Sequence, residues 1–543
     1  MKKTRRVNFT LLLFILSASL FAEKFVSEIK PLNGEKWYGA YTAKAFCGTP
    51  LKDLTFQPYL TNEKKKDLNV DNRANQAAPV LISNQGRYVW SNQAFAFEMK
   101  DGSVIIYSDV EKVEAVAAGK TLRDAYLGAM KVNFPASGKT PELLMFKMPQ
   151  YNMWIELNYN QDQQKVLKYA NDVIKNGFPT GVFMVDEGWT KYFGNFEFDP
   201  SRFPNPKGMV DELHAKGFKV MVWVSPFISP DSKEFKQLAK NNCLVMKKDK
   251  SRPALIKWWE GYSACLDLTN PVAMEWLRGQ LKDVQTKYGI DGFKFDAADF
   301  DFYNDKSAFY SNDETTTSGP LQAEMYGKLG AEFQFNEFRA GWKNGNQPLA
   351  QRLQDKGYSW DDLKLLVPDM LSAGLIGHLF TCPDMIGGGL LSTFENIDIS
   401  KFDQELMVRS AQLQALMPMM QFSVAPWRVL DEKHLGYVRE AASLHAKMSN
   451  IISELAQKAA IDGEPIVRHL EYVFPQQGFE ACNDQYMLGD KYLVCPMVDK
   501  GETRNVKLPK GNWVDDLGKK YKGGKTITIN VPLNRLAYFI LQK

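Results

Sequence analysis

The strongest constraint on the fold is a change of pattern after Pro149, where apolar runs of strand length begin to alternate with longer helical patterns. The first predicted strands lie at residues 153–157 and 181–185, each followed by a predicted helix, at 161–176 and 206–216. A helix at 271–288 leads into a strand, and the later predicted strands lie at 218–224, 292–295, 338–340, 350–353, 378–382 and 419–422. Such alternation gives a parallel sheet with helices outside it. Roughly eight units over about 300 residues predict an α/β fold, a (β/α)8 TIM barrel.

Two β-rich segments flank the predicted barrel. Residues 23–148 alternate in short runs between turn residues, for example at 86–90 and 102–107. This spacing predicts an N-terminal antiparallel β-sandwich domain. After the helical patterns end, alternation returns around Gly and Pro turns and predicts a small C-terminal β-domain. The predicted domains are therefore 23–148, 149–460 and 461–543.

The first 22 residues have the order of an export signal. A basic start at residues 2–6 precedes an apolar run at 9–16, and small residues stand at Ser19 and Ala22 before a charged pair. This order predicts a signal peptide over residues 1–22 and an exported, periplasmic or secreted protein. An uncleaved anchor is the alternative, but the run is short for a bilayer and no other stretch reaches roughly 18 apolar residues. We therefore expect no membrane association after cleavage. The six cysteines permit disulfides, but their low density predicts that most are buried small hydrophobes.

The composition argues against several functional classes. The chain has 67 basic and 63 acidic residues, and a net charge of +4 is too weak to indicate nucleic-acid binding. Its five histidines are scattered, without the His or Cys spacing of a zinc enzyme. Aromatic residues reach 13%, and flat amphipathic rings suit a sugar-binding cleft, with a large core as the alternative.

Three predicted barrel strands end in carboxylates. Asp186, Asp296 and Asp384 each follow an apolar strand directly or within two residues. Reactive side chains of a (β/α)8 barrel lie at the C-terminal ends of its strands. One such residue alone is more often a helix N-cap, but several converging at the same end of one sheet predict an active site.

Lys294 and Asp296 stand two residues apart on one predicted strand. They therefore share a face and project toward the barrel axis. A carboxylate kept anionic by an ammonium is a competent nucleophile, and Lys294 could also contact the substrate. A structural ion pair inside the barrel is the alternative reading, and the strand-end position favours function.

Asp355 is the candidate for a second carboxyl group, acting as acid/base. Two carboxyl groups about 5–5.5 Å apart perform double displacement at a sugar carbon with retention of configuration. Two carboxylates suffice for this reaction, so no metal or organic cofactor is implied. A solvated loop residue is the alternative reading of Asp355.

From about Asp186 to the C-terminus the chain resembles glycoside hydrolase family 31, whose members are retaining α-glycosidases with a TIM barrel. The matching segments follow the family order, at residues 198–204, 208–214, 217–224, 267–271, 292–299, 383–388, 485–490 and 509–513. The resemblance implies an oligosaccharide or glycoside substrate.

The same resemblance implies roles for individual residues. Asp296 is the nucleophile and Asp355 the acid/base. Substrate-binding residues on this basis are Asp186, Trp189, Trp259, Lys294, Arg339 and Asp384. Among these, Arg339 is aimed at hydroxyls of the glycone, the sugar that is released. Trp259 forms an aromatic wall, with its neighbour Trp258 as the alternative, and Asp384 mainly supports the others.

Departures from the family pattern bear on the sugar. α-Glucosidases of the family have Trp where this chain has Arg352, and a sugar-binding His that is missing around residues 421–423. The Lys-Phe-Asp sequence at 294–296 resembles the branch that contains the myogenesis-regulating glycosidase and bacterial α-galactosidases. An axial hydroxyl at C4 suits a charged donor such as Lys294, so we predict an exo-acting α-galactosidase. The alternatives are an α-glucosidase, α-xylosidase or sulfoquinovosidase of the same family, or a catalytically silent carbohydrate-binding protein.

Overall fold

The computed structural model describes residues 25–42, 56–70, 75–303, 309–310, 318–395 and 397–542. The predicted signal peptide and Cys47 lie outside these ranges, so export stays a prediction. The five cysteines within them are buried. No helix in the described ranges is both long enough and apolar enough to cross a membrane.

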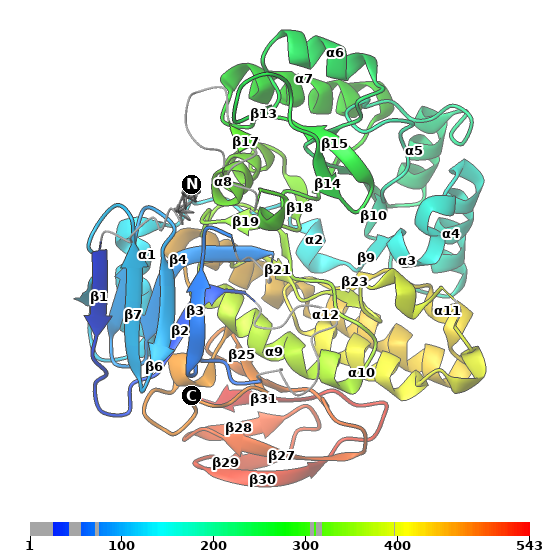
Figure 1. Ribbon diagram of the computed structural model, residues 1–543. Helices are drawn as coiled ribbons and strands as arrows, with labels where there is room; N and C mark the ends of the chain where they lie inside the picture. The colour runs from blue at the N-terminus through cyan, green and yellow to red at the C-terminus, as the bar shows by residue number, and fades with distance from the viewer. Residues whose placement is uncertain are drawn as a thin grey trace, which may run out of the picture.

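A ring of parallel strands forms the centre of the molecule (Figure 1). Its hydrogen-bonded order is β21-β20-β18-β16-β11-β10-β9-β23-β22. The bounds are β9 (Gln150–Asn152), β10 (Val182–Val185), β11 (Lys219–Val224), β16 (Gly292–Phe295), β18 (Phe335–Phe338), β20 (Gln351–Arg352), β21 (Thr381–Cys382), β22 (Met385–Ile386) and β23 (Gln421–Phe422). Only Pro383 and Asp384 separate β21 from β22, so these two are halves of one interrupted strand. The ring therefore has eight strand positions among the described residues, and the predicted (β/α)8 barrel is confirmed.

Helices surround this ring, as the sequence pattern predicts. The longer ones are α4 (Gln163–Lys175), α5 (Pro206–Ala215), α6 (Lys233–Lys240), α7 (Pro271–Tyr288), α8 (Gly319–Gly330), α9 (Trp360–Leu375), α10 (Gln404–Ala415) and α12 (Glu432–Asp462), and the shorter ones are α2 (Leu144–Lys147) and α11 (Pro426–Val429). Helix α7 has the predicted bounds because its caps are local. The Asn270 side chain accepts a hydrogen bond from the backbone N–H of Val272, and Gly289 ends the helix with φ of 78°.

The first predicted strand is wrong. Residues Trp154–Leu157 form the short helix α3, and the strand lies earlier, at β9. The cause is the Asn152 side chain, whose Oδ1 accepts a hydrogen bond from the backbone N–H of Trp154 at 2.9 Å and turns the chain out of the sheet. The strand predicted at 338–340 also lies earlier, at β18, so Arg339 directly follows the strand end.

The N-terminal domain consists of two sheets. One has the antiparallel order β1 (Phe25–Ile29), β7 (Ser103–Ser108), β6 (Ala96–Lys100), β3 (Glu63–Asp67). The other is built around β4 (Gln76–Ser83), with β2 (Trp37–Tyr41), β5 (Arg87–Trp90), β8 (Ala115–Ala117) and β19 (Gly341–Trp342). Leu81, Val89, Phe97 and Val104 come from both sheets into one buried core. Helix α1 (Leu122–Asn133) packs on β4 and β5.

The N-terminal domain reaches the barrel strand that ends near Asp355. Strand β19 belongs to the barrel segment but pairs in parallel with β4. At the start of β4, the buried Gln76 side chain donates hydrogen bonds to the carbonyl oxygens of Arg339 and Arg352, both at 2.9 Å. The backbone of two site residues is therefore fixed by a side chain from more than 260 residues earlier.

An antiparallel insertion after β11 supplies the mouth of the barrel. Its order is β12 (Phe227–Ile228), β15 (Gly261–Cys265), β14 (Ile256–Trp258), and a second small pair joins β13 (Met246–Lys247) to β17 (Phe309–Tyr310). The turn between β14 and β15 contains Trp259.

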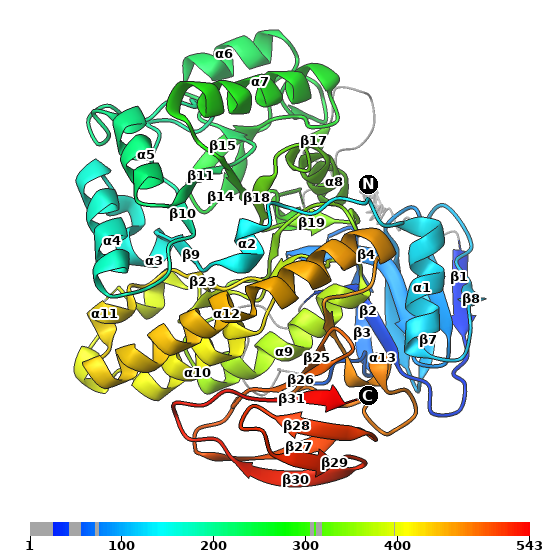
Figure 2. The same ribbon diagram turned by 180° about the vertical axis from the view of Figure 1, so that it is seen from behind.

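The C-terminal domain is a six-stranded antiparallel sheet with a separate pair of strands. The sheet order is β24 (Val467–Arg468), β25 (Tyr486–Leu488), β26 (Tyr492–Cys495), β31 (Ala537–Gln542), β28 (Asn512–Asp515), β29 (Lys520–Lys522), and the pair is β27 (Thr503–Leu508) with β30 (Lys525–Asn530). The short α13 (Leu470–Val473) follows β24. In Figure 2 the domain lies below α9 and α10. Arg409 of α10 donates to the carbonyl oxygens of Gly501 and Val531, at 2.9 and 2.8 Å, and so joins it to the barrel.

Candidate active site

A cavity of about 400 Å³ opens at the C-terminal ends of the barrel strands. Six of the eight predicted site residues line it, and Trp189 and Asp384 do not. The lining residues are Trp154, Tyr159, Asp186, Glu187, Trp259, Lys294, Asp296, Arg339, Arg352, Asp355, Met385, Gly389, Leu390, Leu391, Ser392 and Glu395.

Asp296 follows β16 and is almost fully buried, with 6% of its surface exposed. Its Oδ2 accepts a hydrogen bond from Trp223 Nε1 at 2.8 Å and lies 3.5 Å from Lys294 Nζ. Its Oδ1 accepts a hydrogen bond from the backbone N–H of Ala297, also at 2.8 Å. Ala297 and Ala298 both have positive φ, 58° and 69°. Such backbone strain in non-glycine residues is typical of functional sites.

Asp296 is held as a carboxylate. Burial raises the pKa of its carboxyl group, but the charges of Lys294 and Arg339 outweigh burial and bring the pKa below its ordinary value. Arg339 Nε lies 3.7 Å from Asp296 Oδ1. An ionised carboxylate with one edge in a cavity has the form that a nucleophile needs.

Lys294 joins Asp296 to a second carboxylate. Its Nζ donates a hydrogen bond to Asp186 Oδ2 at 2.7 Å, and both residues are buried. Asp186 Oδ1 in turn accepts a hydrogen bond from the backbone N–H of Glu187 at 2.8 Å. The predicted sharing of one strand face by Lys294 and Asp296 therefore places a cation between two acidic groups at the bottom of the cavity.

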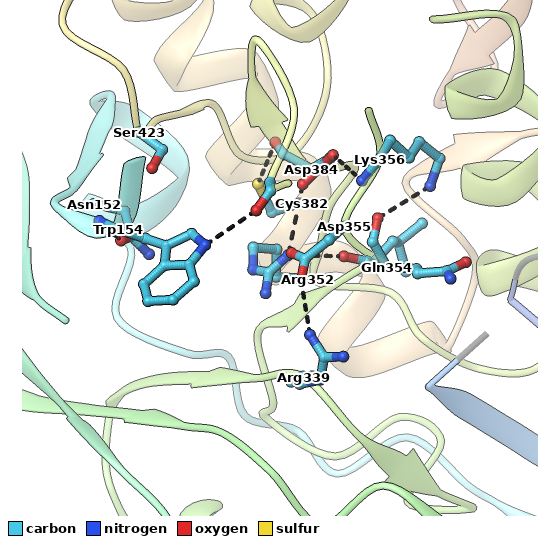
Figure 3. Close-up of polar contacts among 12 residues, drawn as sticks. Asn152, Trp154, Arg339, Arg352, Gln354, Asp355, Lys356, Cys382, Asp384 and Ser423 are labelled. Atoms are coloured by element: carbon cyan, nitrogen blue, oxygen red, sulfur yellow. Dashed lines mark hydrogen bonds and ion pairs between the residues drawn. The ribbon is translucent and has the colours of Figure 1, made fainter. Parts of the chain in front are cut away.

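Asp355 lies beyond the end of β20 between two arginines (Figure 3). Arg339 donates from Nη1 to Asp355 Oδ2 at 2.8 Å, and Arg352 donates from Nη1 to Asp355 Oδ1 at 2.5 Å. Although burial raises the pKa of the Asp355 carboxyl group, the charges of Arg352 and Arg339 bring it well below its ordinary value. Because Arg339 lies close to both Asp296 and Asp355, the two predicted catalytic carboxyl groups belong to one cavity and one charge network.

Arg339 also contacts residues other than Asp296 and Asp355. Its Nε donates to Asp299 Oδ2 at 3.1 Å, and its guanidinium lies 5.4 Å from the centre of the Trp259 ring. Trp259 is 42% exposed and donates from Nε1 to Glu187 Oε2 at 3.0 Å. Trp259 therefore forms an open aromatic wall, whereas its neighbour Trp258 is buried against Phe227.

Trp189 and Asp384 lie behind the cavity. Trp189 is buried and donates from Nε1 to the carbonyl oxygen of Trp223 at 2.7 Å, so it supports the residue that contacts Asp296. Asp384, between β21 and β22, accepts a hydrogen bond from the backbone N–H of Lys356 at 2.9 Å. Its Oδ1 lies 3.5 Å from Arg352 Nη1. Burial and the negative charge of Asp355 raise the pKa of Asp384.

Several residues in the site were not predicted. Glu187 directly follows Asp186, and Trp223 lies on the strand next to Lys294, so adjacency could have indicated both. Arg352 departs from the pattern of the family's α-glucosidases, and no role was predicted for it. Glu337, on β18, contacts Arg352 and accepts a hydrogen bond from Gln421, which no local pattern reveals. Within the ranges that the structure describes, no group of three or more His, Cys, Asp or Glu residues could hold a metal ion.

Two family domains match the chain. The glycosyl hydrolases family 31 TIM-barrel domain matches residues 144–453, more than half of the chain, and the family 31 C-terminal domain matches residues 463–542. This chain belongs to glycosyl hydrolase family 31.

Named relatives of this family 31 protein have several activities in their names. The mouse myogenesis-regulating glycosidase is 30% identical over 435 residues, which cover 78% of this chain and 60% of that protein. Alpha-xylosidase XylQ of Lactiplantibacillus pentosus is 25% identical over 82% of this chain and 60% of its own length. The chain thus spans about 60% of these curated relatives. Among solved structures, the Flavobacterium johnsoniae family 31 dextranase complexed with glucose superposes with a TM-score of 0.82 at 20% identity, covering 95% of this chain and 66% of that one. This likeness confirms the fold.

Proposed function

We propose that this protein is an exo-acting retaining α-glycoside hydrolase, and specifically an α-galactosidase. Asp296 attacks the anomeric carbon of a terminal α-linked sugar while Asp355 protonates the departing oxygen. The bond from C1 to the leaving oxygen breaks as the bond from C1 to an Asp296 oxygen forms. Asp355 then takes a proton from water, the water oxygen bonds to C1, and Asp296 leaves as a carboxylate.

The observation that carries this proposal is the position of Lys294. It contacts Asp296 at 3.5 Å and Asp186 at 2.7 Å, inside the cavity that also contains Asp355. The ammonium supports the ionised nucleophile, and with Asp186 it offers a sugar hydroxyl one donor and one acceptor. A hydroxyl group can donate and accept at once, so this pair suits a secondary hydroxyl held at the bottom of the cavity.

The charges of the cavity support a neutral sugar over a sulfonated one. The cationic residues that line it are Lys294, Arg339 and Arg352, and each contacts at least two carboxylates at 3.7 Å or less. The remaining charged lining residues, Glu187 and Glu395, are acidic. A sulfonate would have to displace existing ion pairs, which makes the sulfoquinovosidase alternative the less favourable one.

An α-glucoside or α-xyloside is the second candidate for the sugar. Relatives carry these names, among them XylQ and an alpha-glucosidase of Bacillus thermoamyloliquefaciens that is 26% identical. The absence of a His around residues 421–423 and the Lys-Phe-Asp sequence favour galactose. A catalytically silent binding protein is not favoured, because a binding site has no need for an ionised Asp296 beside an acid/base group.

The decisive experiment compares aryl α-galactosides with aryl α-glucosides and aryl α-xylosides on the purified protein. We expect the highest kcat/KM on the galactoside, and a preference for another sugar would replace galactose by that sugar. Cyclophellitol-type probes in galacto and gluco configurations should then label the peptide that contains Asp296. The D296N variant is the matched control, because it keeps the shape of the site and should not be labelled. Tight sugar binding with neither turnover nor labelling would support the silent alternative instead.

A further inference from the structure

Arg352 lies at the centre of an acidic cluster behind Asp355. Only 2% of its surface is exposed. Its Nη1 lies 2.5 Å from Asp355 Oδ1 and 3.5 Å from Asp384 Oδ1, and its Nε lies 3.5 Å from Glu337 Oε1. One guanidinium thus contacts three carboxyl groups, and Asp355 is the only one of these three that lines the cavity. In the α-glucosidases that the chain resembles, this position usually holds a tryptophan, which carries no charge.

The charged groups around Asp355 come from four strands or strand ends. The cations are Arg352 on β20, Arg339 after β18 and Lys294 on β16, and the nearby carboxyl groups are Asp384 between β21 and β22 and Asp296 after β16. The charge of Arg352 lowers the pKa of Asp355 more than the charge of Arg339 or of Lys294 does, and Arg339 lowers it further through its hydrogen bond. The pKa of Asp296, by contrast, is lowered more by the charges of Lys294 and Arg339 than by the charge of Arg352.

This arrangement conflicts with half of the proposed reaction. In the first step Asp355 must donate a proton, yet two arginines hold it as an acceptor of two charge-assisted hydrogen bonds. A departing group that is a poor base, such as 2,4-dinitrophenolate, needs little protonation. Without a proton the second sugar of a disaccharide would leave as a strongly basic alkoxide, so it needs the proton from Asp355 and departs as the alcohol.

We propose that Arg352 is a positioning residue that keeps Asp355 as a carboxylate before the substrate binds, and thereby sets the pH at which cleavage of poor leaving groups begins to fall. The proposal rests on the assignment of Asp355 as the acid/base group. A role of Arg352 in binding the sugar would instead change kcat/KM equally for good and poor leaving groups.

The test measures kcat/KM for a disaccharide and for a 2,4-dinitrophenyl glycoside, both with whichever sugar the enzyme cleaves. The ratio of the two values cancels effects on sugar binding and on the nucleophile, and isolates protonation of Asp355.

In the wild type the ratio should fall about tenfold per pH unit through the neutral range, since kcat/KM reports ionisation of the free enzyme. In R352Q the fall should begin at least about one pH unit higher, which raises the ratio about tenfold or more at pH 7. R352K keeps the charge and should follow the wild type. An R352Q curve that coincides with the wild-type curve would overturn the proposal.

A second measurement needs no turnover and so separates this proposal from the proposed function. The free energy of unfolding is measured from pH 7 to pH 3 with and without D355N, in the wild-type and R352Q backgrounds. A carboxyl group whose pKa is lowered by folding stabilises the protein above its ordinary pKa, and this stability is lost as the pH falls through the lower value. The advantage of Asp355 over Asn should therefore shrink below about pH 4 in the wild-type background, and change much less in R352Q. Equal pH dependence in both backgrounds would contradict the role of Arg352, whatever sugar the enzyme cleaves.

Discussion

Two groups of charged side chains, called here the cationic wall and the acidic wall, line the cavity and differ in their electrostatics. The cationic wall consists of Lys294, Arg339 and Arg352, and Asp296 and Asp355 lie against it. The acidic wall consists of Glu187 and Glu395. Glu260 lies behind it and accepts a hydrogen bond from the hydroxyl of the lining residue Tyr159 at 2.6 Å.

Asp296 and Glu187 make the comparison direct. Their exposed fractions are 6% and 3%, and both line the cavity. The pKa of Asp296 is lowered because the charges of Lys294 and Arg339 overcome its burial. Burial raises the pKa of Glu187 to about 9, and the charge of Glu260 adds to it. The neutral indole of Trp259 donates a hydrogen bond to the carboxyl group of Glu187.

Neighbouring cations, rather than burial, therefore decide which of these two carboxyl groups is ionised. At neutral pH the cationic wall presents carboxylates that can attack carbon or accept a proton. The acidic wall presents Glu187 as a neutral acid. In the proposed reaction, the cationic wall therefore provides the nucleophile, and Glu187 of the acidic wall provides neutral polar contacts.

Removal of the nucleophile should have the largest effect. We expect D296A to lower kcat by at least about 10⁴-fold, because the proposed covalent intermediate forms on this carboxylate. Azide should restore turnover and give a glycosyl azide of inverted configuration, since it enters the space left by the side chain. Kinetics with and without azide, and NMR of the product, check this. Substantial residual activity without azide would assign the nucleophile elsewhere on the cationic wall.

Removal of the acid/base group should have a large effect that depends on the leaving group. D355N should lower kcat/KM for a disaccharide by about 10²- to 10⁴-fold, the usual contribution of general acid catalysis. With a 2,4-dinitrophenyl glycoside, which needs little protonation, the loss should be much smaller. Rate measurements on the two substrates check this prediction. Equal losses on both substrates would mean that Asp355 binds the sugar and does not protonate the leaving group.

Loss of the Lys294 charge should make the electrostatic surroundings of Asp296 more like those of Glu187. K294M leaves Asp186 and Asp296 buried without their shared partner, which should cost about 3–5 kcal/mol in the free energy of unfolding. It should also raise the pKa of Asp296, so that the acidic limb of the kcat/KM profile moves to higher pH. Urea unfolding and pH profiles measure both effects. The double variant K294M/D186N should recover part of the stability, whereas additive losses would contradict the ion pair.

The sequence predicted the cationic wall better than the acidic wall, for a local reason. A two-residue period places Lys294 and Asp296 on one face wherever the strand lies. The bounds of α7 were also predicted correctly, and its Asn270 and Gly289 caps fix these bounds locally. The direction of a side chain just after a strand end depends more on contacts with distant segments. Trp189 follows its strand closely, yet its indole supports Trp223 behind the site.

The remaining features of the site depend on contacts between distant segments. The hydrogen bonds from Gln76 to the backbone of Arg339 and Arg352 require a strand of the N-terminal domain to pair with β19. The contacts of Arg352 with Glu337 and Asp384 require three strands in register. No period or motif encodes such neighbours. The resemblance to the family identified Asp355, but it gave no indication that two arginines hold its carboxyl group.

The smallest effect on activity should come from E187Q, a change in the acidic wall. The matched change D186N, one residue away, should give the sharpest contrast with it. E187Q replaces a protonated acid by an amide, so kcat/KM at pH 7 should stay within about threefold of the wild type. D186N makes the same chemical change one residue away but removes a charge paired with Lys294, and should lower activity strongly.

Wild-type Glu187 retains its proton when folded and loses it on unfolding between its ordinary pKa and about 9. The stability of the wild type relative to E187Q should therefore fall by up to about 1.4 kcal/mol per pH unit across that window. Urea unfolding at pH 5, 7 and 8.5 measures this slope, and a flat difference would show that Glu187 is ionised like the carboxylates of the opposite wall.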